Sequence, residues 1–136
     1  MVVSALLRNL RPVLHPTVVC YCLLPAHQDV RHVPWIGLFR ESEGLTVIVA
    51  EETAHQRGWP VMFRAAWITL TIQSDLSAVG LTAAVSGALA EAGISCNVVA
   101  AVNHDHLFVP IELGPSALSV LEGLQRAAEQ ASHPST

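Results

Sequence analysis

The chain has 136 residues, the size of one ordinary domain or of two small units. Its 7 basic residues, all of them Arg, stand against 11 acidic ones, and only 13% of the residues are charged while 51% are hydrophobic. This balance excludes a disordered chain, and it excludes a protein that binds nucleic acid through a basic face. With so few charges, much of the surface is apolar, so we expect a compact domain that self-associates.

The first half of the chain is interrupted by prolines, and its pattern predicts short elements. In chain order these are a helix at 6–10, a strand at 17–24, a polar connection at 26–34, strands at 36–41 and 45–50, and a helix at 52–57. The two later strands form a hairpin around Ser42-Glu43-Gly44, and Gly58 ends the helix.

The second half has a cleaner periodicity. Residues 67–73 alternate strictly between apolar and polar and predict a half-buried strand. The remaining expected elements are a helix at 78–92 with Ser77 as its N-cap, strands at 94–102 and 107–111 around the turn Asn103-His104-Asp105, and a helix that opens at Gly114-Pro115. The order strand, helix, strand, strand, helix indicates an α+β unit. The first half has a similar but less regular order of elements.

Three stretches of the second half resemble an ACT domain. They are Trp67-Ile-Thr-Leu-Thr-Ile, then Asp75-Leu-Ser-Ala-Val-Gly-Leu, then Leu89-Ala-Glu-Ala-Gly-Ile-Ser-Cys-Asn. The ending His104-Asp-His-Leu-Phe-Val-Pro and the earlier Glu43-Gly-Leu-Thr are similar to one branch of that family, the small stand-alone bacterial proteins with two ACT-like units and no attached enzyme. One departure is Val79, where many ACT domains carry proline before the glycine.

The resemblance implies a ferredoxin-like ACT fold with two tandem βαββαβ-type units, antiparallel sheets and helices on one face. We expect a degenerate N-terminal unit at residues 1–62 and an ACT domain at residues 63–136. Each half alone is marginal in size for a stable core, so we expect the units to bury their sheets together. The resemblance also implies that units pair and bind an amino acid at their interface.

The loop before the helix at 78–92 is the expected ligand site. A helix N-terminus presents free backbone N–H groups to a carboxylate, and these are expected from Val79, Gly80 and Leu81. Gly80 lets a ligand approach the backbone closely. Asp75 and the side-chain oxygen of Asn97 are expected to accept hydrogen bonds from an ammonium group. The alternative is purely local: an Asx turn at Asp75, close packing at Gly80 and an exposed Asn97.

The expected function is therefore a regulatory sensor that binds a small amino acid or related carboxylate, without catalysis and without a cofactor. No nucleophile elbow, P-loop or dinucleotide motif appears in the sequence. Two alternatives stay open: an interaction or oligomerisation module with a vestigial ligand site, and a metal-dependent site at His104 and His106, although the sequence fixes no third ligand and we assign no metal.

The remaining expectations concern assembly and compartment. We expect a homodimer, no nucleic-acid partner and no membrane segment, because the apolar runs are far shorter than a span needs. The first residues lack a basic, signal-peptide-like pattern, so we expect a cytoplasmic protein. Cys20 and Cys22 would point the same way on one strand and could not easily bridge, and Cys96 is expected to pack as a small hydrophobe.

Overall fold

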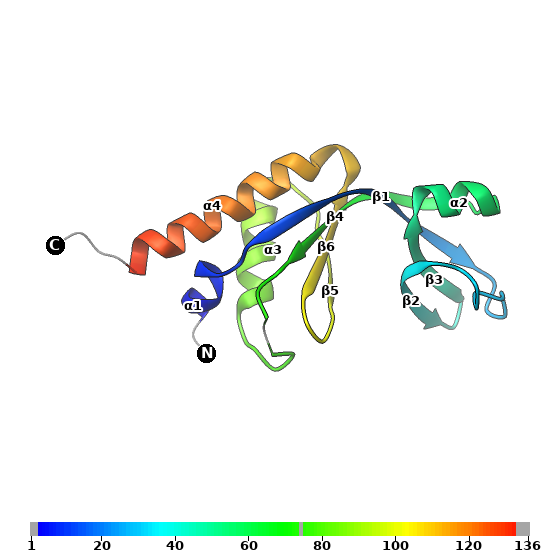
Figure 1. Ribbon diagram of the computed structural model, residues 1–136, viewed down its shortest axis with the longest axis horizontal. Coiled ribbons are helices and arrows are strands. Elements are labelled where there is room, and N and C mark those ends of the chain that lie inside the picture. The colour runs from blue at the N-terminus through cyan, green and yellow to red at the C-terminus, as the bar shows by residue number, and fades with distance from the viewer. Residues whose placement is uncertain (1–2, 74, 133–136) are drawn as a thin grey trace.

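Six strands form one antiparallel sheet in the order β2-β3-β1-β4-β6-β5 (Figure 1). The structure is a computed structural model that describes residues 3–73 and 75–132, with the backbone alone at residue 132. Its elements are α1 (Val3–Arg8), β1 (Pro12–Leu24), β2 (Trp35–Glu41), β3 (Gly44–Ala50), α2 (Glu51–Arg57), β4 (Val61–Leu70), α3 (Leu81–Glu91), β5 (Asn97–Ala100), β6 (Asp105–Pro110), the 3-10 turn η1 (Ile111–Leu113) and α4 (Gly114–Ser132).

The sheet consists of two four-stranded units that share their two longest strands. The first half of β1 pairs with the end of β4, and its second half pairs with the start of β4, with a shift of register between Leu14 and Val18. The first unit is then β4-β1-β3-β2 and the second is β1-β4-β6-β5, so each has the strand order of a ferredoxin-like fold. The sequence predicts separate sheets; because β1 and β4 belong to both units, the sheets are instead continuous.

The ferredoxin-like α+β class expected from the sequence is confirmed, but the two units are not equally complete. In the first, residues 25–34 form a connection without a helix between β1 and β2, where the second unit has α3 between β4 and β5. The division at residues 62 and 63 stays a prediction. In the sheet, β4 runs across that position.

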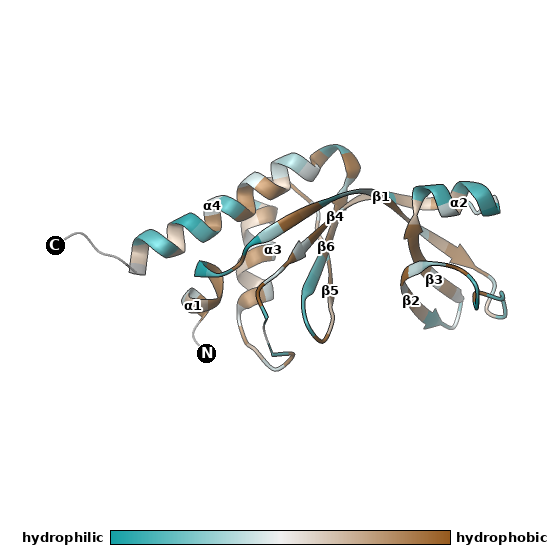
Figure 2. Ribbon diagram, viewed as in Figure 1, coloured by the Kyte–Doolittle hydropathy of each residue, from teal (hydrophilic) through white to brown (hydrophobic). Residues whose placement is uncertain are grey.

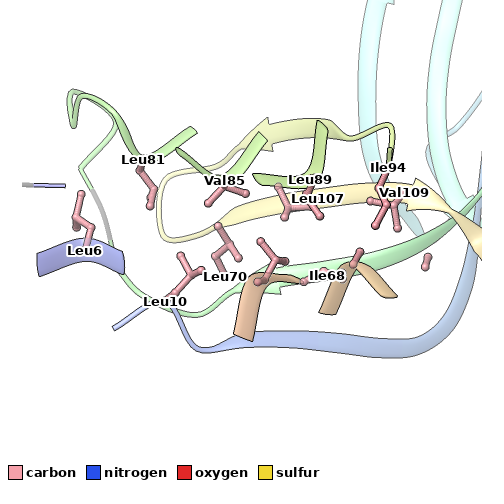
Figure 3. Packing of buried hydrophobic residues seen from close by; sticks show 13 residues of the cluster. Leu6, Leu10, Ile68, Leu70, Leu81, Val85, Leu89, Ile94, Leu107 and Val109 are labelled. Atoms are coloured by element: carbon pink, nitrogen blue, oxygen red, sulfur yellow. The ribbon is translucent and has the colours of Figure 1, made fainter. Parts of the chain in front are cut away.

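The main core lies between the sheet and the helices of the second unit. Leu70 and Ile68 of β4 face α3 and α4, because alternate residues of a strand point to the same side. Figure 3 shows these side chains meeting Val85 and Leu89 of α3 and Leu107 of β6. The fully buried members contributed by the helices are Leu6 of α1, Val85 and Leu89 of α3, and Ala117 and Leu121 of α4.

A smaller core lies beneath α2 in the first unit. Figure 2 shows that α2 is largely hydrophilic, and only Thr53 and Ala54 of this helix are buried. They cover Cys20 and Cys22, which are both buried and free, as expected from their spacing along β1. An ion pair between Arg64 of β4 and Glu51 also ties the helix to the sheet.

The opposite side of the sheet, called the open face below, carries no α-helix from residues 3–73 or 75–132. Its buried centre is a third cluster around Val19, Ile48, Ala65 and Phe108, with Trp67 packed against it. The sheet curls over this face: in Figure 1 the β2–β3 pair and the β5–β6 pair lie on either side of the region where β1 and β4 run together.

The expected elements are present, but several of their boundaries differ. The first helix is Val3–Arg8 instead of 6–10, β1 begins at Pro12 instead of residue 17, and β4 is Val61–Leu70 instead of 67–73. The third helix is also shorter than its pattern predicts. The hairpin of β2 and β3, the helix end at the left-handed Gly58 and the start of α4 at Gly114 are confirmed. α3 begins at Leu81 instead of residue 78, so Ser77 is not its N-cap. Likewise the strand expected at 94–102 is only Asn97–Ala100.

Candidate functional site

The N-terminus of α3 is open. Gly80 is the N-cap residue, no side chain in the described part of the chain caps the helix, and the first helical hydrogen bond runs from the Ala84 N–H to the Gly80 carbonyl at 3.0 Å. The N–H groups of the first turn therefore lack helical partners and mark the positive end of the helix dipole. Gly80 has a φ of 98°, so this position needs glycine for its backbone conformation.

The loop that leads into α3 is held by Asp75. Its carboxylate accepts a hydrogen bond from the Ser77 N–H at 3.1 Å, and its carbonyl accepts one from the Ala78 N–H at 2.9 Å. The hydrogen bonds from Ser77 hold the pKa of Asp75 below its usual value. The Asx turn weighed from the sequence is therefore present, and it displaces Ser77 from the capping role.

The predicted loop residues differ in how they can meet a ligand. Asp75 is exposed, and Val79 is 83% exposed. Leu81 is only 3% exposed and packs in the main core, so its backbone alone is available. A valine at Gly80 would strain the loop, because its φ lies in the left-handed region.

Two hollows meet at Asp75. A small one of about 40 Å³ is lined by Asp75, Ala78, Leu81, Thr82, Ala100 and Asp105, among others. It shares Asp75 and Leu76 with a broader, open hollow of about 420 Å³, lined also by Gln73, Val102 and Asn103. The small hollow has space for one charged group, and the broader one has space for the rest of a small molecule.

Asp105 is the residue that the sequence interpretation missed. It is 9% exposed, it lines the small hollow together with Asp75, and no hydrogen bond to its carboxylate is found among the described residues. Burial raises the pKa of Asp105, while His106 and His104 act in the opposite direction. The sequence contains a pattern that could have identified it: the alternation of Leu107 and Val109, continued back by two residues, places Asp105 on the core side of β6.

Asn97 does not join this site within one chain. It lies opposite Phe108 on the open face, where its amide donates a hydrogen bond to the Phe108 carbonyl at 3.3 Å. Ala100, which lines the small hollow, is three residues further along β5, or about 10 Å at the rise of a strand. The structure therefore does not bring Asp75 and Asn97 together within one chain, because they lie on opposite faces of the sheet, and a ligand role for either side chain stays a prediction.

The metal alternative at His104 and His106 gains no support. Nδ1 of His104 lies 3.3 Å from the Ile72 carbonyl, and Nδ1 of His106 accepts a hydrogen bond from the indole N–H of Trp67 at 3.1 Å. Across residues 3–73 and 75–132, no three His, Cys, Asp or Glu side chains gather in a way that could hold a metal ion.

The comparisons with known proteins agree on the fold. Residues 2–66 match one family model described as an ACT domain, and residues 63–123 match a second with the same description. A Vibrio cholerae protein of unknown function, described as a possible transport protein, has a crystal structure that is 40% identical with a TM-score of 0.81, and the match covers 90% of this chain and 94% of that one. No curated protein sequence matches this chain.

Two more distant structures share the fold alone. The regulatory subunit of aspartate kinase from Thermus thermophilus is 13% identical with a TM-score of 0.65, over 83% of this chain and 95% of that one. A protein from Agrobacterium tumefaciens is 16% identical with a TM-score of 0.62, over 80% and 84% of the two chains.

Proposed function

This chain belongs to the ACT domain family, and from that premise we propose that it is a regulatory protein that binds a small amino acid or a related carboxylate at residues 75–81 and does no chemistry on it. The observation that carries the proposal is the uncapped N-terminus of α3 beside two carboxylates, Asp75 and Asp105. Free N–H groups and carboxylates side by side suit the two ends of an amino acid.

Each group of the ligand then has a partner. The backbone N–H groups of Val79, Gly80 and Leu81 take the carboxylate, where the helix dipole favours negative charge. Asp75 takes the ammonium group, and Asp105 replaces Asn97 as its second acceptor. The side chain of the ligand occupies the broader hollow next to Leu76 and Val102. Family membership supports the regulatory role, as does the fold shared with a protein described as a regulatory subunit of aspartate kinase.

Self-association is the second part of the proposal. Large apolar side chains are exposed on the first unit, including Phe39 at 71% and Met62 at 68%. Such exposure favours a homodimer, and it also favours the second candidate function, an interaction module whose ligand site is vestigial. No helix in the described ranges, 3–73 and 75–132, is long and apolar enough to cross a membrane. The cytoplasmic location stays a prediction.

Calorimetry with the twenty amino acids tests the proposal. We expect at least one to bind, and we expect Asp75→Asn to weaken it about ten- to a hundredfold, because a charge-assisted hydrogen bond contributes ~1.5–3 kcal/mol. Asparagine keeps the oxygen that accepts from the Ser77 N–H, so the loop is preserved. Glu91→Gln, which removes an exposed charge at the far end of α3, is the matched control.

Two results would contradict the proposal. One is that no amino acid binds the wild-type chain. The other is that binding persists undiminished in Asp75→Asn. In either case the interaction module becomes the better account, and light scattering that shows a dimer at tens of micromolar would support it.

A further inference from the structure

A second pocket lies on the open face, on the other side of the sheet from α3. It has a volume of about 330 Å³, at the lower end of the range for small-molecule sites. Its walls come from both units: Ile36 and Gly37 of β2, Ile48 of β3, Trp67 of β4, Val99 and Ala101 at β5, and His106 and Phe108 of β6. Because the sheet curls, its two edge strands line the same pocket. All but two of these side chains are purely apolar.

The hydrogen bonds around His106 fix where its proton is. An indole N–H can only donate, so Nδ1 of His106 accepts from Trp67 at 3.1 Å and carries no proton itself. The Thr69 hydroxyl lies 3.0 Å from the same nitrogen and 2.7 Å from Nε2 of His15, so it joins the two rings. In the neutral ring, the proton of His106 is on Nε2.

Nε2–H of His106 is an unused donor on the lining of the pocket. The described residues supply hydrogen bonds to Nδ1 of His106 only, so Nε2 has no partner among them. The indole N–H of Trp67 is already used, which leaves Nε2–H of His106 as the one free polar side-chain group on the lining of this largely apolar pocket. A ligand that fills this pocket must offer one acceptor.

The charges around His106 favour an uncharged ligand. Burial lowers the pKa of His106, and so do His104 and His15, while Asp105 raises it. A proton added at Nδ1 would also remove the hydrogen bond from Trp67. The ring is therefore a neutral donor, and no Lys or Arg lines the pocket to balance a carboxylate.

We propose that this pocket binds a small uncharged molecule that has an apolar body and one oxygen acceptor, which takes the hydrogen bond from Nε2–H of His106. The site is distinct from the amino-acid site proposed at α3, because the two lie on opposite faces and share no lining residue. Its position between β2 and β5 means that an occupant contacts both units at once.

A matched set of probes tests the chemistry. Phenylacetamide carries the uncharged acceptor, phenylacetate replaces it with a charge, and ethylbenzene lacks it. Binding is followed by NMR of the full chain, through the indole N–H signal of Trp67 and the ring nitrogens of His106. We expect phenylacetamide to shift both sets of signals and to bind at least tenfold more tightly than phenylacetate.

Two variants locate the binding. Ala101→Phe puts a ring into the pocket from an exposed position and is expected to abolish the shifts, while Ala90→Phe, at an exposed position on α3, leaves them unchanged. His106→Phe is expected to weaken phenylacetamide about five- to tenfold, since the ligand loses the hydrogen bond from Nε2–H. The variant also removes the acceptor of the Trp67 indole N–H, so ethylbenzene, which is expected to bind as in the wild type, serves as the control for that change.

The outcomes are distinct. No shift with phenylacetamide, or shifts that survive in Ala101→Phe, would overturn the site. Phenylacetate binding as tightly as the amide would overturn the assignment of an uncharged ligand. Neither result bears on the amino-acid site, whose signals belong to the amides of residues 75–81.

Discussion

Asp105→Asn should raise the stability of the fold and lower its affinity for the proposed ligand. The carboxylate is 9% exposed and has no hydrogen-bond partner in the described part of the chain, so at neutral pH the fold carries the cost of a poorly solvated charge. Asparagine has the same shape without the charge. We expect a gain of about 1 kcal/mol at pH 7, equal to a rise of roughly 3 °C in Tm for a chain of this size.

The pH dependence separates this cause from a packing effect. Burial raises the pKa of Asp105 above its usual value, so the folded chain binds this proton more tightly than the unfolded chain does. The cost to the wild type is complete above the folded-state pKa and disappears as the pH falls toward the unfolded value near 3.8. The advantage of Asp105→Asn should therefore shrink in the same window.

Chemical unfolding measures the stability of both proteins at pH 7 and at pH 4, and calorimetry at pH 7 measures the affinity for the ligand. If the proposed function is right, Asp105→Asn also weakens the ligand about tenfold, because one acceptor for the ammonium group loses its charge. A variant that is no more stable at pH 7, or whose gain is the same at pH 4, would refute the reasoning about the buried charge.

Two further predictions concern stability. Burial lowers the pKa of His15 and of His106, so the free energy of unfolding should fall as the pH drops through 6.5 and on through the lower folded-state pKa values. Urea unfolding at pH 7.5 and 5.5 should show a smaller loss of stability in the double variant His15→Gln/His106→Gln than in the wild type. Equal losses would contradict this prediction. Gly80→Ala should lower the stability of the fold by about 1–2 kcal/mol, because φ at this position is 98°. Gly87→Ala, at an exposed position inside α3, should raise the stability by about 0.5–1 kcal/mol. Thermal melts in which both variants shift Tm in the same direction would contradict this prediction.

The sequence predicted those parts of the fold that depend on neighbouring residues. Alternation identified the end of β4, residues 67–70, and turn chemistry identified the hairpin around Glu43 and the helix end at Gly58. That β1 and β4 belong to both units was not predictable in this way, because it depends on pairing between residues far apart in the sequence, such as Pro12 with Leu70. Periodicity along one segment contains no information about that partner.

The candidate site was predictable only in part, for the same reason. The loop at Asp75 and the glycine before α3 stand out locally, and the structure places them at one end of the helix. Asp105 was interpreted as a turn residue, because its neighbours His104 and His106 are polar as well; the alternation of Leu107 and Val109 continued back by two residues places it on the core side, and its strand partner Leu70 confirms this. The pocket on the open face brings together residues from both edges of the sheet, which no local pattern reveals.

The measurement that tests the central claim most directly is an NMR titration of the full chain with the amino acids, read through the backbone amides. The proposed function predicts that the binding amino acid shifts the signals of Val79, Gly80 and Leu81, whose N–H groups receive its carboxylate. Signals of the open face, such as Gly37, should stay in place. An amino acid that binds while every amide from residue 75 to residue 81 keeps its position would contradict the account.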